Sequence, residues 1–331
     1  MQDAILLGVD GGNTKTDFFL FNCLGTRLAH LRTGTCSHEA LPGSYREAEQ
    51  LLDERINQVC GKAGITRQNI SRAVFGLAGA DTHEQHVKLL AITERLLPGK
   101  TLVCNDSMLG VMAAAPGGIG VCSINGTGAS VCGVNEQGQT LQVGGIGHVS
   151  SDFAGGRFAA MEVLRCVYSA RYRDGDPTAL TKEVLELLDA EETADLMELF
   201  HYDNLKLDDE LTYRLNRLLF RCAREGDEVS QSVLHTMART LAQSTAGCIK
   251  YLGFRESTTV VLAGSLWTKG DYPDMLQVFQ EEVRQRVNCS CNFTVLEEPP
   301  ALGAVLEAYR RVAGEPLTEE LRERFAAGVR G

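Results

Sequence analysis

The sequence has no long apolar run. No stretch approaches the ~18 uninterrupted apolar residues that would span a bilayer. The apolar start is short, contains Asp3 and leads directly into an acidic turn, which is unlike a secretory signal peptide. We therefore expect a cytoplasmic protein with no membrane partner.

Clusters of basic residues are also absent. Lysine and arginine number 32 against 43 aspartates and glutamates, so the formal net charge is −11. Nucleic acids and anionic membranes favour a positive protein face, so we expect neither as the main partner. A small anionic substrate would have to be bound by local donors.

The eleven cysteines include no Cys-x-x-Cys pair, and the closest spacing is Cys289-Ser290-Cys291. Zinc and iron–sulfur sites usually show tighter clusters. Most of these cysteines lie in apolar stretches, which favours buried reduced thiols and a reducing compartment.

The 331 residues are enough for two domains with separate cores. In the first part we expect strands over residues 5–9, 17–21, 27–32, 73–77 and 101–104, with helices over 44–63 and 84–96. Residues 113–118 contain a proline and paired glycines and form the candidate hinge. This pattern predicts one α/β domain at residues 1–115 and a second at 116–314.

The most informative pattern is a turn that follows the first strand. The turn reads Asp10-Gly11-Gly12-Asn13-Thr14-Lys15-Thr16, and a second strand follows it directly. Strand–turn–strand predicts a hairpin, whereas the glycine loops of common nucleotide fingerprints open a helix. Its backbone N–H groups could bind phosphate, with Gly11 and Gly12 allowing close approach and positive φ, and Asp10 could hold a hydrated metal cation. The alternative is an ordinary Asp-Gly hairpin.

The same order of elements recurs about 115 residues later. A strand over 119–124 leads to Asn125-Gly126-Thr127-Gly128, strands over 129–134 and 140–143 follow, and a later strand over 258–263 ends at Gly264-Ser265. The repetition predicts two related α/β halves that face a common cleft. Helical spacing predicts helical additions in the second half, over 153–172, 180–188, 192–199, 208–223 and 229–253. Further elements are expected at 272–287, 292–296, 300–313 and 317–329.

Together these turns resemble the two phosphate motifs and the adenosine motif of the ATPase superfamily that includes sugar kinases, actin and Hsp70. The resemblance narrows on four segments: residues 10–16, Asn105-Asp106-Ser107, residues 125–128, and Gly144-Gly145-Ile146-Gly147-His148 with Asp152. These segments are similar to the BadF/BadG/BcrA/BcrD ATPase family, and within it to the N-acetylglucosamine kinase branch. The resemblance implies two ribonuclease H-like (actin-like ATPase) domains around a central cleft. It also implies that a C-terminal helix at 315–331 packs back on the first domain.

The resemblance implies that ATP and Mg²⁺ are bound, with Asp10 near the metal. The implied contacts to phosphate and nucleotide are Gly11, Gly12, Asn13, Thr14, Lys15, Gly126, Thr127, Gly128, Gly226, Gly264 and Ser265. For Gly226, which lies in a helix–helix turn, a plain helix C-cap is the alternative to contact with the base.

Asp106 is the implied catalytic base. Phosphoryl transfer to a sugar hydroxyl needs a carboxylate that can accept the hydroxyl proton. Asp106 follows a buried-type strand, at the position where the family has its base. The alternative is a helix N-cap, because Asn105 and Asp106 both precede an apolar helix.

The implied sugar site combines Asp106 with the second glycine-rich loop. The substrate residues there are Gly145, Ile146, Gly147 and Asp152, and His148 is interpreted as orienting the loop. Near the end of the third strand the branch has an asparagine, but this chain reads Thr35-Cys36-Ser37-His38. Ser37 and His38 are therefore the candidates for reading the 2-acetamido group or a ring hydroxyl. A second departure, Asp152-Phe153-Ala154-Gly155-Gly156, also affects the sugar, so glucosamine and N-acetylmuramic acid stay open.

We expect an ATP-dependent kinase that phosphorylates a primary hydroxyl of an amino sugar and, as is common in the family, forms a homodimer. One alternative within the family is an ATP-driven activator of a radical dehydratase or reductase, whose cysteines hold an iron–sulfur cluster between subunits. Such activators resemble one another in a segment that differs from the glycine-rich loop here. Another alternative is a sugar-sensing regulator, but no DNA-binding segment precedes Ile5.

Overall fold

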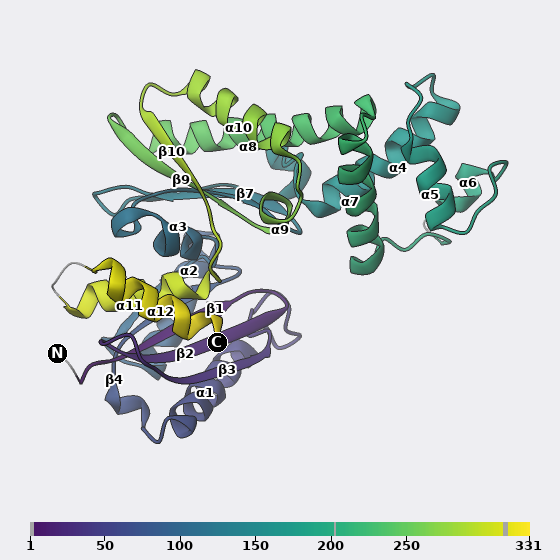
Figure 1. Ribbon diagram of the computed structural model, residues 1–331. Coiled ribbons are helices and arrows are strands. Elements are labelled where there is room, and N and C mark those ends of the chain that lie inside the picture. Colours follow the sequence, from purple (N-terminus) through teal and green to yellow (C-terminus); the bar gives the residue numbers. More distant parts are fainter. Residues whose placement is uncertain (1–2, 202, 314–316) are drawn as a thin grey trace. The chain divides into compact units, whose positions relative to one another are not determined.

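The computed structural model describes residues 3–201, 203–313 and 317–331 (Figure 1). The strands are β1 (Ile5–Gly11), β2 (Lys15–Asn22), β3 (Arg27–Gly34), β4 (Ile70–Leu77), β5 (Thr101–Cys104), β6 (Gly120–Asn125), β7 (Ala129–Val134), β8 (Thr140–Gly144), β9 (Ser257–Ala263) and β10 (Ser290–Val295). The helices are α1 (Ser44–Lys62), α2 (His83–Leu96), α3 (Met108–Ala114), α4 (Gly156–Tyr172), α5 (Leu180–Leu187), α6 (Leu196–Leu199), α7 (Asp209–Arg224), α8 (Glu228–Tyr251), α9 (Ser265–Thr268), α10 (Pro273–Arg286), α11 (Ala301–Ala313) and α12 (Glu319–Arg330). The predicted α/β class is confirmed.

The first sheet has the strand order β3-β2-β1-β4-β5. β1 pairs antiparallel with β2 and parallel with β4, and β4 pairs parallel with β5. Because side chains alternate across a strand, each face of β1 has its own core. Leu7 and Val9 belong to the buried cluster shared with α1 and α2. On the other face, a Cβ at Gly8 would lie 2.6 Å from Val305 Cγ2, so α11 packs directly on the sheet.

The second sheet repeats this order. Its strands run β10-β9-β6-β7-β8. Within this half, β6 to β10 are the first to fifth strands. Read from β8 to β10, their order is therefore 3-2-1-4-5, as in the first sheet. β6 therefore occupies the place of β1, and the turn after β6 occupies the place of the Asp10 turn. The predicted repetition of two related α/β halves is confirmed at the level of strand order.

Helices α4 to α7 are inserted between β8 and α8, and they are the predicted helical additions (Figure 1). The structure differs from the prediction at two helix ends. α4 begins at Gly156 rather than 153, because Gly155 has φ +88 and lies outside the helix. α6 spans four residues rather than 192–199, because Asp195 caps it by accepting a hydrogen bond from Met197 N.

The chain separates into two compact units. One comprises Met1–Cys122, Cys132–Thr140 and Leu296–Gly331, and the other comprises Ser123–Val131 and Leu141–Val295. The expected domain limit at 115/116 falls inside the first of these segments, and α11 groups with the first unit. The expected limits at residue 1 and at 314/315 lie outside the described residues.

The C-terminal helix α12 packs within the first unit. The rings of Phe325 and Phe21 lie 5.4 Å apart between centroids, and Arg27 Nη1 donates to Gly328 O at 2.8 Å. This contact places the last helix against β2 and β3.

Two arginines hold the end of α3. Arg310 Nη2 donates to Met112 O at 3.0 Å, and Arg322 Nη2 donates to Ala113 O at 3.2 Å. Burial lowers the pKa of Arg310. These donors satisfy carbonyls that a helix C-terminus leaves open. The end of α3, where the predicted hinge at residues 113–118 begins, is therefore held by these hydrogen bonds. Movement about this hinge stays a prediction.

In the part of the chain that the structure describes, no helix has the length and apolar character required to cross a membrane.

Candidate active site

The β1–β2 hairpin presents a tight tip. Gly12 N donates to Lys15 O at 3.0 Å, which closes a turn with Asn13 and Thr14 at its exposed centre. Below the tip, Gly11 is paired with Thr16 and Asp10 with Asp17. The hairpin is therefore the predicted strand–turn–strand, and its exposed donors at residues 13–15 can meet an anion.

The expected positive φ at Gly11 and Gly12 was wrong. Neither residue is among the glycines with positive φ, because the two central positions of the turn are Asn13 and Thr14. The requirement for glycine at position 11 is steric. A Cβ there would lie 2.7 Å from Leu77 Cδ2, so the neighbouring strand β4 leaves no room for a side chain.

A charged cluster centred on Asp17 supports this hairpin, and sequence reasoning missed it. The buried Asp17 carboxylate accepts hydrogen bonds from His30 Nε2 and Arg32 Nε, both at 2.8 Å, and lies 3.7 Å from Lys15 Nζ. Burial alone would raise the pKa of Asp17, but the hydrogen bonds from Arg32 and His30 outweigh it and lower that pKa. The available signal was the spacing of His30 and Arg32, which share one face of β3.

Asp10 and Asp106 form the acidic part of the site. Burial, followed by the negative charges of Asp106 and Asp17, raises the pKa of Asp10 to about 7. Burial and the charge of Asp81 raise the pKa of Asp106 to about 6. Carboxylates that are crowded and desolvated in this way favour a bound cation, and carboxylate oxygens are the ligands that Mg²⁺ prefers. The donor set thus fits a magnesium ion at Asp10.

Asn105 orders the turn that leads into α3, whose N-cap position is Ser107. Its Oδ1 accepts a hydrogen bond from Ser107 N at 2.9 Å, and its Nδ2 donates to Asp81 Oδ1 at 2.7 Å. The backbone then turns into the helix, with Met108 N donating to Asn105 O at 3.0 Å. Neither Asn105 nor Asp106 occupies the N-cap position, and the turn places the Asp106 carboxyl group near those of Asp81 and Asp10.

Ser37 and His38 lie close to the acidic residues of the first unit but are buried. Ser37 Oγ donates to Ala78 O at 3.5 Å, and the ring of His38 stacks on Tyr45 with centroids 4.0 Å apart. Among the described residues, His38 Nδ1 has no hydrogen-bond partner. Burial lowers the pKa of His38, so its neutral form is favoured. A neutral imidazole with one open nitrogen can read a hydroxyl or an amide.

The turn after β6 is held by the start of α4. Gly126 N donates to Gly128 O at 2.9 Å, which closes the turn. Gly156 N donates to Gly126 O at 2.8 Å, and Arg157 N donates to Thr127 O at 3.1 Å. The first amides of α4 are therefore bonded to this turn, and they fix its backbone.

Two glycines with positive φ pack against the same turn. A Cβ at Gly155 would lie 2.6 Å from the carbonyl carbon of Gly128, and one at Gly264 would lie 2.5 Å from that of Asn125. Asn125 Oδ1 accepts a hydrogen bond from Gly155 N at 2.9 Å, while its buried Nδ2 has no partner among the described residues. Three backbone segments thus meet without side chains between them. Such a cradle is suited to a ligand that is bound through the main chain.

A cavity of about 810 Å³ opens beside this cradle. Its lining includes the predicted residues Gly126, Thr127 and Ser265 together with side chains of α7. Asn216 Nδ2 donates to Gly156 O at 3.0 Å at its base, and the Arg217 guanidinium lies 5.9 Å from the Tyr213 ring centroid at its wall. Both the volume and the mixed lining are typical of a small-molecule site. Sequence reasoning did not identify Asn216 or the other α7 residues that line this cavity. The spacing of apolar residues predicts which face of a helix is buried, but not whether the opposite face lines a cavity.

Gly226 has the geometry of a helix C-cap. It has φ +97, Gly226 N donates to Ala223 O at 3.2 Å, and Asp227 N donates to Cys222 O at 2.9 Å. These two bonds form a Schellman motif. Gly226 is not among the residues that line the 810 Å³ cavity, and its contact with the base stays a prediction.

The loop over residues 144–152 folds around the carboxylate of Asp152. Asp152 Oδ2 accepts hydrogen bonds from Gly145 N at 2.9 Å, Gly147 N at 2.8 Å and Ser150 Oγ at 2.6 Å. Ile146 is 67% exposed on this loop. The expected role of His148 in orienting the loop belongs instead to Asp152, because His148 is exposed and Asp152 binds the backbone.

The structure groups the predicted residues within each unit. In the first unit, the Asp10 hairpin, Asp106, Ser37 and His38 belong to one end of the first sheet. In the second unit, the turn at 126–128, Gly264 and Ser265 form one cradle, while Gly145, Ile146, Gly147 and Asp152 form a separate loop. The assignment of these residues to ATP and sugar stays a prediction.

Comparison with known proteins gives one family. The model of the BadF/BadG/BcrA/BcrD ATPase family matches residues 7–308. An N-acetyl-D-glucosamine kinase of Dictyostelium discoideum is 27% identical over 325 residues, covering 93% of this chain and 98% of the relative. An N-acetylmuramic acid/N-acetylglucosamine kinase of Clostridium acetobutylicum is 23% identical over 318 residues, covering 92% of this chain and 97% of the relative.

Solved structures agree in fold. A protein of Chromobacterium violaceum, provisionally assigned as an N-acetylglucosamine kinase, has a TM-score of 0.60 at 21% identity and covers 93% of this chain and 100% of its own. A ROK hexokinase from Thermus thermophilus has a TM-score of 0.55 at 18% identity, and the match covers 94% of this chain and 100% of the hexokinase chain. At these identities the likeness concerns the fold, which is the two-domain actin-like ATPase fold. The predicted fold class is confirmed.

Proposed function

The chain belongs to the BadF/BadG/BcrA/BcrD ATPase family, and we propose that it transfers the γ-phosphoryl group of ATP to a primary hydroxyl of an amino sugar. The enzyme class is that of both curated relatives, which are kinases and align over more than nine-tenths of this chain. Their names support N-acetylglucosamine or a close relative as the acceptor. One observation carries the proposal. The carboxyl group of Asp106 follows β5, lies near the carboxyl groups of Asp10 and Asp81, and has a pKa raised to about 6.

Asp106 accepts the proton of the sugar hydroxyl while the oxygen of that hydroxyl attacks the γ-phosphorus. The bond between the γ-phosphorus and the ADP oxygen then breaks. A base with a pKa near the working pH combines a useful ionised fraction with good proton affinity. The half-buried position of Asp106 supports this role, because burial is the main cause of the raised pKa. Closure about residues 113–118 would exclude water from the reacting phosphoryl group.

The nucleotide site is proposed in two parts. In the first unit, Asp10 would hold Mg²⁺, and Asn13, Thr14 and Lys15 would donate to phosphate beside Gly11 and Gly12. In the second unit, the turn Gly126-Thr127-Gly128 would bind phosphate through its backbone, and Gly264 and Ser265 would adjoin the adenosine. The unpartnered Asn125 Nδ2 and the 810 Å³ cavity support a nucleotide there. Bound Mg²⁺ supplies positive charge that offsets the charge developing on the phosphates.

Sugar contacts are proposed within each unit separately. Asp152 holds the backbone of Gly145 and Gly147 and has a second carboxylate oxygen for a sugar hydroxyl. Ile146 would contact the apolar face of the ring. Ser37 and the open nitrogen of His38 would read the substituent at carbon 2, where this chain departs from the branch.

The test is ATP turnover against a panel of amino sugars, using protein purified anaerobically with its iron content measured. The expected result is sugar-dependent release of ADP without iron, fastest with N-acetylglucosamine, N-acetylmuramic acid or glucosamine. ATPase activity that is independent of sugar, in an iron-loaded dimer, would show instead an activator of a radical dehydratase or reductase.

We further propose a cytoplasmic homodimer, as is common in the family. Light scattering during size-exclusion chromatography measures the mass directly. A particle of twice the 36.0 kDa chain mass is expected, and a monomer at micromolar concentration would contradict it.

A further inference from the structure

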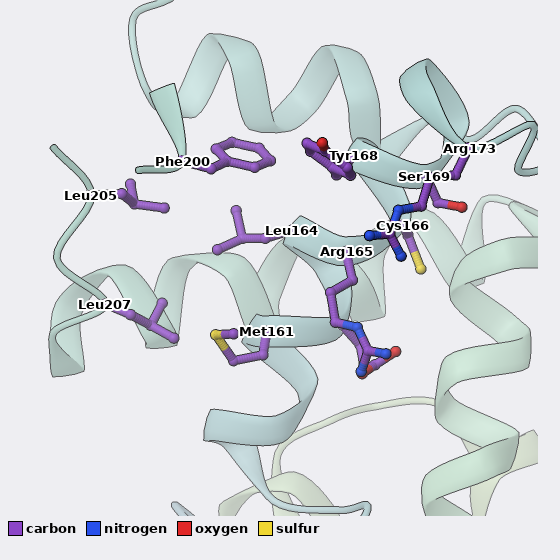
Figure 2. A pocket seen from close by; sticks show the side chains of 11 residues that line it. Met161, Leu164, Arg165, Cys166, Tyr168, Ser169, Arg173, Phe200, Leu205 and Leu207 are labelled. Atoms are coloured by element: carbon purple, nitrogen blue, oxygen red, sulfur yellow. The ribbon is translucent and has the colours of Figure 1, made fainter. Parts of the chain in front are cut away.

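A second cavity lies along the middle of α4. It has a volume of about 630 Å³, in the range of small-molecule sites. α4 contributes one wall, and Phe200, Leu205 and Leu207, which follow α6, contribute another (Figure 2). It shares no lining residue with the 810 Å³ cavity assigned to the nucleotide. The proposed kinase reaction makes no use of it.

The two ends of this cavity differ in chemistry. The side chains of Leu164, Phe200 and Leu205 gather at one end (Figure 2). Ser169 and Arg173 lie at the other end. An apolar end and a cationic end in one cavity match a ligand that has an apolar body and a single acidic group.

Arg173 is a cation available to a ligand. Its guanidinium carbon lies 5.7 Å from the Tyr168 ring centroid, and Tyr168 Oη donates to Met197 Sδ at 2.9 Å. No ion pair to Arg173 occurs among the described residues, whereas Arg165, nearby in the lining, pairs with Glu162. The aromatic contact orders the Arg173 side chain without neutralising its charge. An anion at this end would therefore gain a charge-assisted hydrogen bond.

The same helix connects this cavity to the phosphate turn. Arg157 N donates to Thr127 O at 3.1 Å, and Met161, which lines the cavity, lies four residues further along α4. Residues four apart on a helix are one turn apart on the same face. The start of α4 is thus bonded to Gly126 and Thr127, and a displacement of this helix would be transmitted to that turn.

We propose that this cavity is a second binding site, for a small amphipathic anion, and that its occupancy changes the affinity of the nucleotide site through α4. The apolar body lies against Leu164, Phe200 and Leu205, and the acidic group pairs with Arg173. By linkage, bound nucleotide changes the affinity for the anion by the same factor.

The probe is 8-anilinonaphthalene-1-sulfonate, which has an aromatic body and one sulfonate. Its binding is measured by fluorescence titration. Saturating ADP–Mg²⁺ is present so that the nucleotide cavity is already filled. Saturable binding is expected, weakened about tenfold or more in Arg173→Glu because a charge-assisted hydrogen bond is lost. N-phenyl-1-naphthylamine has the same aromatic body without the sulfonate and should bind equally to Arg173→Glu, which reports an intact cavity. Leu207→Asp should weaken both probes.

Lys182→Glu is the matched control. Lys182 lies exposed on α5 and lines neither cavity, so reversing its charge should leave both probes unaffected. The coupling is measured by ADP titration with and without the sulfonate probe, where a change of several-fold is expected in the wild-type chain but not in Arg173→Glu. Equal sulfonate affinity in Arg173→Glu and wild type, or an ADP affinity that the probe leaves unchanged, would overturn the proposal. A failed kinase assay has no bearing on either readout.

Discussion

Asp10 and Asp17 are directly opposed residues of the antiparallel β1–β2 pair. Like charges in this position repel each other. Asp17 accepts hydrogen bonds from His30 and Arg32 and lies beside Lys15, whereas the groups that act most strongly on Asp10 after burial are the carboxylates of Asp106 and Asp17. Of the two opposed carboxylates, Asp17 is therefore paired with basic side chains, and Asp10 is the one we propose for the cation.

Replacing Asp17 by Asn should destabilise the protein by about 1–2 kcal/mol, because the buried side chain that accepts hydrogen bonds from Arg32 and His30 loses its negative charge. The loss is moderated by Arg32 and Lys15, which are more than half exposed and can be solvated by water. Urea unfolding measures the change. Asp53→Asn, which removes a more exposed ion pair to Arg67, is the control and should cost less than about 0.5 kcal/mol. Equal losses in the two variants would contradict the role of burial.

The contribution of Asp17 should also depend on pH. Its pKa is lower in the folded state than the ordinary value of 3.8, so ionisation favours folding. The resulting stability is fully present above pH 3.8 and is lost as the pH falls through the lowered pKa. The difference in unfolding free energy between wild type and Asp17→Asn should therefore shrink only below about pH 4. A difference that shrinks near pH 6 would assign the effect to another group.

Asp106→Asn should retain nucleotide binding and lose about 10²–10⁴-fold in kcat, because the amide cannot accept the hydroxyl proton. ADP release with sugar measures turnover, and calorimetry measures ADP affinity. Asp176→Asn, at an exposed position, controls for the loss of one negative charge. Near-normal turnover in Asp106→Asn would remove this residue from the mechanism.

The pH profile of turnover should have an acid limb near pH 6. The pKa of Asp106 is raised to about 6, and the base must be ionised to accept a proton, so kcat/KM should fall about tenfold per pH unit below that value. Saturating ATP–Mg²⁺ keeps Asp10 in its metal-bound form during the measurement. Circular dichroism over the same range controls for unfolding. A limb near pH 4 would show that Asp106 is not buried in the working state.

Gly264→Ala should abolish measurable ADP binding. The added Cβ would lie 2.5 Å from the carbonyl carbon of Asn125, at φ +98, so the cradle must open. Gly138→Ala is the matched control, since Gly138 also has positive φ but no heavy atom within 4 Å of the added Cβ. The control should lose about 1 kcal/mol of stability and keep its ADP affinity. Equal ADP affinities in the two variants would place the nucleotide elsewhere.

The elements of this fold were largely predictable, because apolar strands end in glycine-rich turns and helices follow regular spacing. The turn at 126–128 was recognisable because glycines after an apolar strand are a local signal, whereas Asp106 was singled out through the family resemblance, and its role stays a prediction. The Asp17 cluster was missed because it depends on the register between β2 and β3, which no local pattern determines. The role of Asp152 in holding its own loop was also missed, since a carboxylate in sequence does not show whether it faces a ligand or its own backbone.

The repeated strand order gives this chain two turns at equivalent places, one after β1 and one after β6. The first is acidic, Asp10-Gly11-Gly12, and the second is neutral, Asn125-Gly126-Thr127. Only the first of these two topologically equivalent turns therefore carries a carboxylate that could attract a divalent cation. Although the strand order is doubled, the charge pattern of the two turns is not, so the two halves of the chain are equivalent in backbone topology but differ in electrostatics at this position.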